Sequence, residues 1–105
     1  MIKREKAKSI IQENNNMVRI TKYLFNPGEE TKMHKHLFDY VVTPITNGKI
    51  LLIDKNGIKK NSTLKISNSY FRKAGVEHNV VNIGTEKLIF IEVELKNIKK
   101  ELEYE

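Results

Sequence analysis

The sequence predicts an all-β protein built as one antiparallel barrel. Short runs rich in β-branched and aromatic residues follow one another along most of the chain. Turn residues separate these runs at regular intervals, and Asn56-Gly57 is the strongest two-residue hairpin signal. Many short strands with regular turn signals are typical of a sandwich or barrel. We expect irregular or helical structure only at the ends, with a turn or two of helix within Ile2–Gln12 and a charged tail over Asn97–Glu105.

The expected strands can be placed from alternation and from turn residues. The run from Met17 to Phe25 alternates and ends at Asn26-Pro27-Gly28, a turn signal. Further turns are expected at Gly48, Gly75 and Gly84. The predicted strands are residues 17–25, 32–36, 38–45, 49–55, 58–66, 69–72, 78–82 and 86–95.

The length of 105 residues fits a single domain with a modest core. We divide the chain into an N-terminal arm (1–16), the barrel (17–95) and a charged C-terminal tail (96–105). There is no cysteine, which fits a reducing compartment and leaves no thiolate ligand for a metal. The basic start lacks the apolar core of a signal peptide, and no run approaches the roughly 20 apolar residues of a membrane span. We therefore expect a cytoplasmic protein with no membrane partner.

The net charge of +6 raises the question of nucleic-acid binding. The excess comes from 16 lysines scattered along the chain, whereas arginine, which reads phosphates and bases better, occurs only three times. The clusters Lys59-Lys60 and Lys99-Lys100 are typical of solvated turns and tails. We expect no nucleic-acid partner.

Three histidines carry the strongest chemical signal. His34 and His36 are separated by one residue, which on a strand places both imidazoles on one face, roughly 7 Å apart. His78 starts a later strand, just after Gly75. Neutral imidazoles each offer one lone pair to a metal ion, and ligands from separate strands can converge. A lone His-x-His pair is weak evidence, since such a pair also occurs by chance on a surface.

The wider spacing resembles that of the cupin family. Gly28, His34, His36 and Gly48 match the first cupin motif, G-x5-H-x-H-x3–4-E-x6-G. The segment 75–82 resembles the second motif, G-x5-P-x-G-x2-H-x3-N, in its last glycine, histidine and asparagine. The resemblance implies a double-stranded β-helix, or jelly-roll, barrel with a pocket inside. It also resembles a subgroup, with a DYVV-type run after the histidines, that is labelled as β-alanine degradation cupins.

The resemblance implies a metal site formed by His34, His36 and His78, and it fails at the fourth ligand. The family's glutamate falls on Val41, or on Tyr40 with the shorter spacing. Asp39 lies nearby and would repair the set if a bulge turned it inward. With imidazole ligands alone we expect a divalent ion, Zn, Fe, Mn or Ni, which the sequence does not rank.

Other polar residues near the motifs are candidates for the pocket or for plain surface positions. They are Tyr40 and Arg72, which we consider for a catalytic role, together with Tyr70 and Asn82. Glu92 and Glu94 alternate with Ile91, Val93 and Leu95. We expect this aliphatic row to pack the core, and therefore both glutamates to face away from it. In the alternative, the aliphatic row forms a dimer seam and Glu92 points inside.

Three functions remain open. The first is a metal-dependent enzyme acting on a small polar metabolite, in the manner of the dioxygenases, isomerases and decarboxylases or lyases among similar cupins. The second is a non-catalytic module that binds a small ligand in the barrel. The third is a vestigial barrel that mainly dimerises, and in each case we expect a homodimer, because apolar rows such as Ile50–Ile53 need cover.

Overall fold

The structure, a computed structural model, describes residues 3–96 and is all β within that range. No helix capable of crossing a membrane occurs in this part of the chain. The strands are β1 (Lys8–Asn14), β2 (Val18–Phe25), β3 (His34–Lys35), β4 (Asp39–Pro44), β5 (Gly48–Asp54), β6 (Lys59–Leu64), β7 (Tyr70–Arg72), β8 (Glu77–Asn82) and β9 (Leu88–Leu95). Each strand predicted from residue 17 onward is therefore confirmed within a few residues at its ends.

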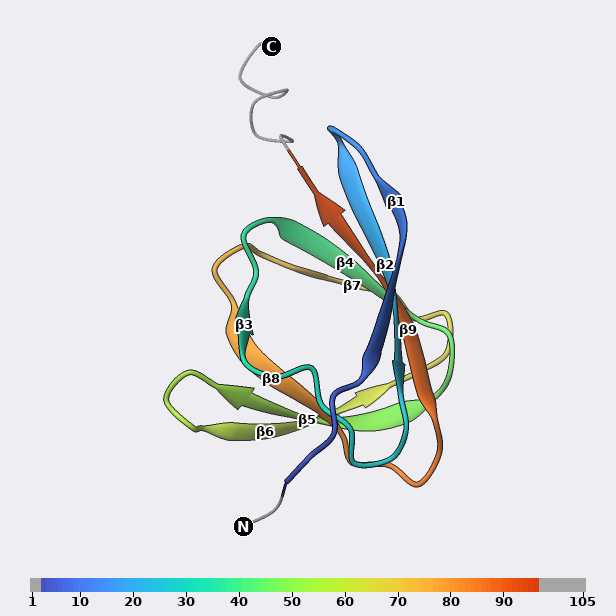
Figure 1. Cartoon of the computed structure of the whole chain (residues 1–105), viewed down its shortest axis with the longest axis vertical. Coiled ribbons are helices and arrows are strands. Elements are labelled where there is room, and N and C mark those ends of the chain that lie inside the picture. Colours follow the sequence, from blue (N-terminus) through green and yellow to red (C-terminus); the bar gives the residue numbers. More distant parts are fainter. Residues whose placement is uncertain (1–2, 97–105) are drawn as a thin grey trace.

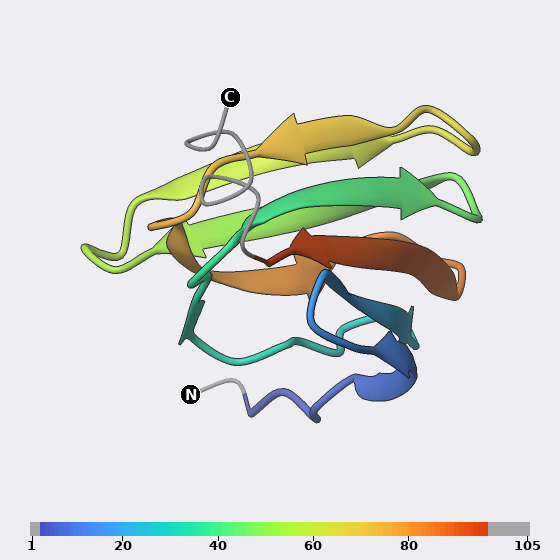
Figure 2. The same ribbon diagram turned by 90° about the horizontal axis from the view of Figure 1, so that it is seen from above.

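The strands form two antiparallel sheets that face each other (Figures 1 and 2). One sheet has five strands in the order β1-β2-β9-β4-β7, and the other has four in the order β3-β8-β5-β6. From β3 onward the chain moves between the sheets at every connection except the β5–β6 hairpin, so strands distant in sequence become neighbours. This is the predicted double-stranded β-helix architecture.

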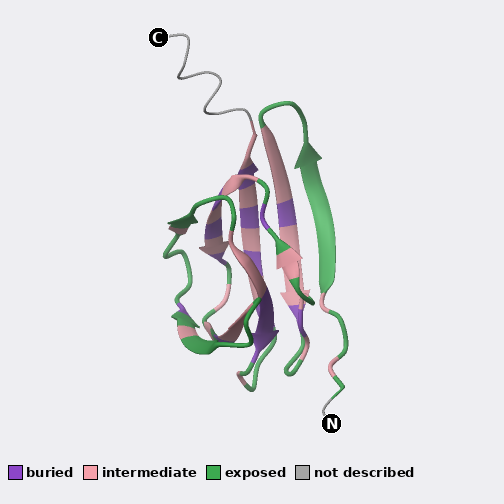
Figure 3. Ribbon diagram, turned by 90° about the vertical axis from the view of Figure 1, so that its left-hand side faces the viewer, coloured by how far each residue is buried: buried purple, intermediate pink, exposed green. Residues whose placement is uncertain are grey.

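The core lies between the two sheets. Inward side chains alternate with outward ones along the strands, so buried and partly buried positions alternate in sequence, most clearly on β4 and β9 (Figure 3). Phe25 and Leu88 are fully buried, and the rings of Phe25 and Phe90 lie 5.5 Å apart. Each such side chain contributes about 1.5–3 kcal/mol by leaving water. The buried cluster consists of Phe25, Tyr40, Val42, Ile50, Leu64, Val80, Leu88 and Phe90.

The helix expected near the N-terminus is wrong. Residues 8–14 form β1, which pairs with β2 so that Ile10 lies opposite Lys22. The β-branched pair Ile10-Ile11 favours this extended conformation. Ahead of β1, the Ala7 N–H donates to the Glu30 carbonyl, which ties the arm to the segment before β3. The C-terminal tail, residues 97–105, lies outside the described residues.

The orientation predicted for the end of β9 is also wrong. Glu92 and Glu94 are each 6% exposed, whereas Ile91, Val93 and Leu95 on the opposite face are only partly buried. The inward row runs from Leu88 and Phe90 into the two glutamates, so the polar residues continue the core rather than the surface. The aliphatic row lies on the outer face of the five-stranded sheet.

Candidate metal centre

The pairing of β3 with β8 brings the two motifs together. His34 lies directly opposite His78 in this antiparallel pair, so their side chains share one face of the sheet. The segment before β3 also lies alongside β8. The Gly28 N–H donates to the Asn82 carbonyl, and the Thr31 N–H donates to the Val80 carbonyl. These backbone bonds fix the register in which the two histidines meet.

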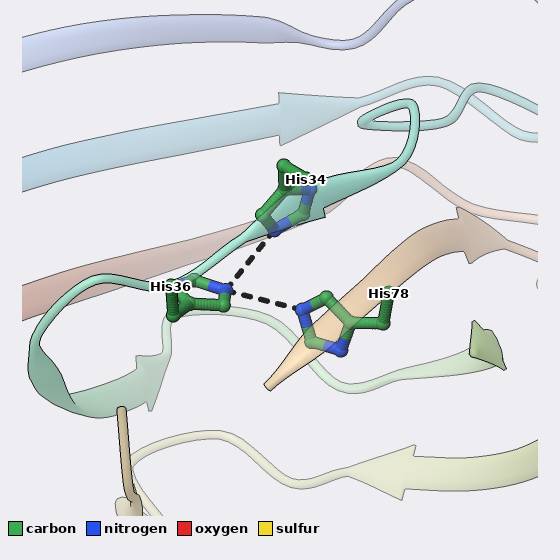
Figure 4. Close-up of side chains that lie close together, drawn as sticks. All are labelled: His34, His36 and His78. Atoms are coloured by element: carbon green, nitrogen blue, oxygen red, sulfur yellow. Dashed lines mark hydrogen bonds between the residues drawn. The ribbon is translucent and has the colours of Figure 1, made fainter. Parts of the chain in front are cut away.

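The three histidines converge through the same ring atom. The Nε2 of His36 lies 3.0 Å from the Nε2 of His34 and 3.1 Å from the Nε2 of His78 (Figure 4). His36 follows β3 rather than belonging to it, and it is the most deeply buried of the three at 5% exposed. The structure thus brings together all three histidines predicted from the sequence.

The spacing of these nitrogens fits a shared metal ion. Two ligands at right angles, each about 2.1 Å from one ion, lie about 3.0 Å apart, and tetrahedral ligands lie about 3.4 Å apart. The distances of 3.0 and 3.1 Å match ligands that occupy adjacent positions of one ion. Three neutral imidazoles supply no charge, so a divalent ion held here keeps its own charge toward the cavity.

The position of the proton on His34 also favours a shared metal ion. The Nδ1 of His34 lies 2.9 Å from the carbonyl oxygen of Lys32, and because a carbonyl only accepts, this Nδ1 carries a proton. In the neutral ring the Nε2 of His34 therefore carries a lone pair, and this lone pair faces His36. Lys32 has a φ of 75°, a conformation that costs energy in a non-glycine residue and here turns its carbonyl toward His34.

His36 is held on several sides. Its backbone N–H donates to the Val76 carbonyl, and its own carbonyl accepts from the Gly75 N–H, both at 2.8 Å. The ring of Tyr40 stacks on the imidazole, with centroids 3.9 Å apart and an angle of 17° between the planes. The Nδ1 of His36 lies 3.8 Å from a carboxylate oxygen of Glu92. The ring is thus fixed in both position and plane.

The environment keeps the buried imidazoles neutral. Burial, with a smaller effect from the neighbouring His34, lowers the pKa of His36 to about 4. Burial, followed by the effects of His34, His36 and Arg72, lowers the pKa of His78 to about 3. Both rings are therefore unprotonated at neutral pH, which is the form that ligates metals.

A cavity of about 140 Å³ adjoins the histidines inside the barrel. Its volume corresponds to about five water molecules in the liquid. His34 and His78 lie on its wall, and five hydroxyl-bearing side chains, Arg72 and Glu92 also reach it. The lining consists of Tyr23, Thr31, His34, Tyr40, Val42, Ile50, Leu52, Ser62, Tyr70, Arg72, Val76, His78, Val80, Phe90 and Glu92.

A larger and more open groove lies elsewhere, and it lacks the chemistry of a site. It measures about 740 Å³ and is lined by residues 47–49, 63–66 and 83–86, including Ile66 and Ile83. None of its lining residues is a histidine. The small cavity beside the three imidazoles is therefore the candidate site.

Arg72 supplies a cation to the cavity wall. Its guanidinium lies 4.5 Å above the ring of Tyr70, the neighbouring inward residue on β7, and this contact holds the charge near the cavity. Tyr40 faces the same space from β4. Burial raises the pKa of both tyrosine hydroxyls, so each stays protonated and can donate a hydrogen bond.

The remaining predicted residues lie away from the histidine cluster. Asp39 points to the outer side of β4, where its carboxylate accepts a hydrogen bond of 2.8 Å from the Ala74 N–H. Val41 faces outward as well, so of the two candidates for the family's glutamate position only Tyr40 faces His36. Asn82 is buried but binds backbone groups of Phe25, Glu86 and Gly84, and it does not line the cavity.

Glu92 is the site residue that the sequence analysis missed. Burial and the neighbouring Glu94 raise the pKa of the Glu92 carboxyl to about 7, while Arg19 acts in the opposite direction. Burial, with the two glutamates adding to it, raises the pKa of the adjoining Tyr23 hydroxyl to about 12. The sequence does contain an indication of its orientation, because Leu88 and Phe90 lie in the same alternating row of β9 as Glu92. The other row is more aliphatic, and alternation alone therefore favours it as the inner row.

The fold and this site can now be set beside known proteins. The chain is 43% identical to the β-alanine degradation protein BauB of Pseudomonas aeruginosa over 93 residues, covering 89% of this chain and 97% of BauB. It is 42% identical to a cupin domain of Bordetella pertussis, with a TM-score of 0.86, covering 91% of this chain and 99% of that domain. This chain belongs to the cupin family. No protein-family model matches it.

A more distant cupin-like structure supports the fold alone. An uncharacterised protein with a double-stranded β-helix domain from Klebsiella pneumoniae is 23% identical, with a TM-score of 0.73, covering 93% of this chain and 84% of that chain. The predicted resemblance to the β-alanine degradation subgroup is thus confirmed at the level of the family, through the first two relatives.

Proposed function

We propose that this cupin binds one divalent metal ion through His34, His36 and His78 and acts on a small polar metabolite in the adjoining cavity. The observation that carries the proposal is the convergence of three Nε2 atoms at 3.0 and 3.1 Å, two of them from histidines on the wall of that cavity. In the metal-free protein a proton on the Nε2 of one ring can join these nitrogens by hydrogen bonds, whereas a cation accepts the lone pairs of all three rings at once.

The chemistry supplied by such an ion is Lewis-acid activation of a carbonyl or carboxylate group, or of a bound water. The protein residues orient the ligand. Arg72 offers a positive charge for an anionic group, and the protonated hydroxyls of Tyr40 and Tyr70 offer hydrogen bonds. Dioxygenase, isomerase and lyase chemistry all begin with a small ligand held in this way, and Zn, Fe, Mn and Ni all accept imidazole ligands.

The size and charge of the cavity favour small carboxylates. About 140 Å³ admits a molecule of only a few heavy atoms, and Arg72 is the cation that faces it besides the proposed metal ion. The name of the Pseudomonas relative links that protein to β-alanine degradation. Small amino-acid-derived carboxylates are therefore the first ligands to test.

Metal analysis of the purified protein tests the proposal. A chain produced without a polyhistidine tag and without chelator is expected to carry about one metal ion per chain. His34→Ala combined with His78→Ala removes two of the three ligands, and the metal should be lost. Lys35→Ala, which changes the exposed residue between the histidines of the first motif, serves as the matched control. A wild-type chain without stoichiometric metal, even after incubation with Zn, Fe, Mn or Ni, would contradict the proposal.

A second candidate function, ligand binding without catalysis, is supported by the polar groups that do not depend on the metal. Thr31, Ser62, Tyr70 and Arg72 reach the cavity from both sheets. A carboxylate that raises the melting temperature of the metal-free protein would favour this alternative. A stabilisation that requires the metal would favour the first.

We also propose that the chain forms a homodimer through the outer face of the five-stranded sheet. The outward residues of this sheet are mainly apolar and only partly covered in the single chain. They are Val18, Ile20, Leu24, Val41, Phe71, Ile89, Ile91, Val93 and Leu95. A continuous apolar sheet face of this kind is covered by packing against another sheet.

The charges around this face favour a second copy of the chain as its partner. Asp39 and Glu13 lie toward one end of the face, opposite Leu95 and Ile20 respectively. Lys22 and Lys8 lie toward the other end. A two-fold axis running across the strands places the acidic end of one copy over the basic end of the other, so the face is complementary to itself.

A further inference from the structure

Glu92 reaches the histidine cluster from the opposite sheet. It belongs to β9, in the five-stranded sheet, whereas His34 and His78 belong to the four-stranded sheet (Figure 1). Its side chain is 8% exposed and lines the same cavity. A carboxylate in such a place needs a compensating partner, because burial of an unpaired charge is costly.

The Glu92 carboxylate faces the ring of His36, on the side away from the other histidines. The carboxylate Oε1 lies 3.8 Å from Nδ1, while Nε2 is the atom that faces His34 and His78. The two nitrogens of an imidazole point in diverging directions, so one ion cannot be bound through Nε2 and at the same time approach Nδ1. Glu92 is therefore placed behind His36 and not as a fourth ligand.

The contact with His36 distinguishes Glu92 from its neighbour Glu94. Glu94 is the next inward residue of β9 and is equally buried, but both of its carboxylate oxygens accept hydrogen bonds from Arg19, at 2.8 and 2.9 Å. Its charge is thus already paired with an arginine. Glu92, one inward position earlier, faces the imidazole instead.

His34 offers a parallel within the same site. Its Nδ1 is held by the carbonyl oxygen of Lys32 at 2.9 Å, which leaves Nε2 as the free nitrogen. The backbone hydrogen bonds and the Tyr40 stack fix the position and plane of the His36 ring, but neither selects which nitrogen carries the proton. The Glu92 carboxylate oxygen lies 3.8 Å from Nδ1, too far for a direct hydrogen bond, and its negative charge favours the tautomer with the proton on that nitrogen.

We propose that Glu92 is a positioning residue of the metal centre, which holds the proton of His36 on Nδ1 so that Nε2 presents its lone pair beside those of His34 and His78. This inference rests on the proposed function for its metal. The first motif has Val41 where the family has a carboxylate. In this proposal a carboxylate from another strand, β9, contributes to the site without binding the metal directly. The cavity side of the cluster is then left free for the ligand.

Zn²⁺ affinity, measured by competition with a chromophoric chelator, tests the inference. Loss of an outer partner of a ligating histidine typically weakens metal binding by 10–100-fold. We expect a decrease in that range for Glu92→Met, and a smaller decrease for Glu92→Gln, whose carbonyl oxygen still attracts an N–H at that position. Glu94→Gln, the matched control on the same face of β9, should stay within about threefold of wild type.

Two outcomes of this titration would overturn the inference. An unchanged affinity in Glu92→Met would show that the carboxylate only fills space. A loss as large as that of His36→Ala, shared by Glu92→Gln, would show that Glu92 is itself a ligand. Thermal unfolding of each metal-free variant establishes that it is folded before its affinity is compared.

A second measurement needs no metal and separates this inference from the proposed function. Nitrogen-15 NMR of the histidine rings in the metal-free protein should show a larger share of His36 with its proton on Nδ1 in wild type than in Glu92→Met, because the contacts of Nε2 with the other two rings favour a proton on Nε2 once the carboxylate is removed. Equal shares in the two proteins would overturn the role of Glu92. A wild-type chain that binds no Zn²⁺ but shows the expected difference would contradict only the proposed function.

Discussion

His34 and His78 occupy directly opposed positions of β3 and β8, so the histidines of the two motifs share one register position. The site depends on this register as much as on the identity of the residues. A slip of one residue between the strands would turn one of the two imidazoles to the other face of the sheet. Residues that fix the register or the packing behind it are therefore as important to test as the ligands.

Gly48, the last glycine of the first motif, is predicted to be required by close packing. A Cβ added there would lie 2.6 Å from the Cδ1 of Leu88, which is fully buried. Gly48→Ala should lower the free energy of unfolding by about 1–3 kcal/mol, as overpacking of a core does. Urea denaturation measures the effect, and combining the change with Leu88→Val should recover part of the loss. Additive losses in the double variant would contradict the packing explanation.

Gly28 of the same motif is predicted to be required for a different reason. Its φ is 84°, and an added Cβ would contact nothing within 4 Å. Gly28→Ala should therefore cost about 1 kcal/mol through backbone strain alone. Gly28→Asn should cost less, because asparagine tolerates positive φ better than alanine does. Equal losses for alanine and asparagine would contradict this account.

Asp39 is predicted to be dispensable for the metal site. Its carboxylate binds the Ala74 N–H on the outer side of β4, and Asp39→Ala should lower stability by about 1 kcal/mol through the lost hydrogen bond. The metal content of the purified variant should equal that of wild type. A variant without metal, but with wild-type stability, would show that Asp39 acts at the histidines instead.

Arg72 is predicted to bind the anionic group of a ligand. Loss of a hydrogen bond to a charged group costs about 1.5–3 kcal/mol, so Arg72→Met should weaken acetate binding to the Zn²⁺-loaded protein by roughly 10–100-fold. NMR titration measures the affinity. Lys73→Met removes the exposed neighbouring cation and should leave the affinity unchanged. Equal effects of the two variants, or no acetate binding by wild type, would contradict the assignment.

Glu30 is predicted to make stability depend on acidic pH. Burial raises the pKa of its carboxyl, but hydrogen bonds from Asn79 and Lys32 and the charges of Lys32 and Arg4 outweigh burial, so the pKa is lowered overall. The folded state therefore favours the ionised form. The stabilisation is present above the unfolded pKa of about 4.3 and is lost as the pH falls through the lower folded value.

The variant Glu30→Gln measures this contribution. It should be less stable than wild type by about 1–3 kcal/mol near neutral pH, and the difference should shrink as the pH falls below about 4. Urea denaturation at a series of pH values follows the difference. A gap that stays constant down to the acid limit would indicate a packing effect rather than a charge effect.

The outer sheet face is predicted to hold the dimer together. Ile91→Lys or Val93→Lys places an unpaired charge in the proposed seam, so either change should shift the chain from dimer to monomer. Light scattering coupled to size-exclusion chromatography measures the mass. Ile58→Lys, at a 64% exposed position in the β5–β6 turn, should leave the mass unchanged. A wild-type chain that is monomeric at high concentration would contradict the proposal.

The fold could be predicted largely from local signals. Alternation and turn residues placed β2 to β9, and the two spaced motifs indicated the barrel and the three histidines. The N-terminal strand was missed because β1 is exposed along its whole length and so lacks the alternation that marks a half-buried strand. Its pairing with β2 is a contact that no local sequence pattern indicates.

The site could be predicted in its ligands but not in its surroundings. Histidine spacing is a property of the chain, whereas the contact of Glu92 with His36 depends on how two sheets face each other. Alternation does not show which face of β9 points inward, because both faces carry apolar residues and the more aliphatic face lies outside. Hydrophobicity alone does not distinguish a core from a surface that another surface is expected to cover.

The central place of β9 limits how this protein can change over evolutionary time. It lies between β2 and β4, with Glu92 on its inner face and Ile91 and Val93 on its outer face. A single-residue insertion or deletion within it would exchange the two faces beyond that point, expelling the carboxylates from the barrel and burying the aliphatic row in their place. This strand can therefore diversify only by substitution, whereas the loop that precedes it, residues 83–87, is not bound by this constraint.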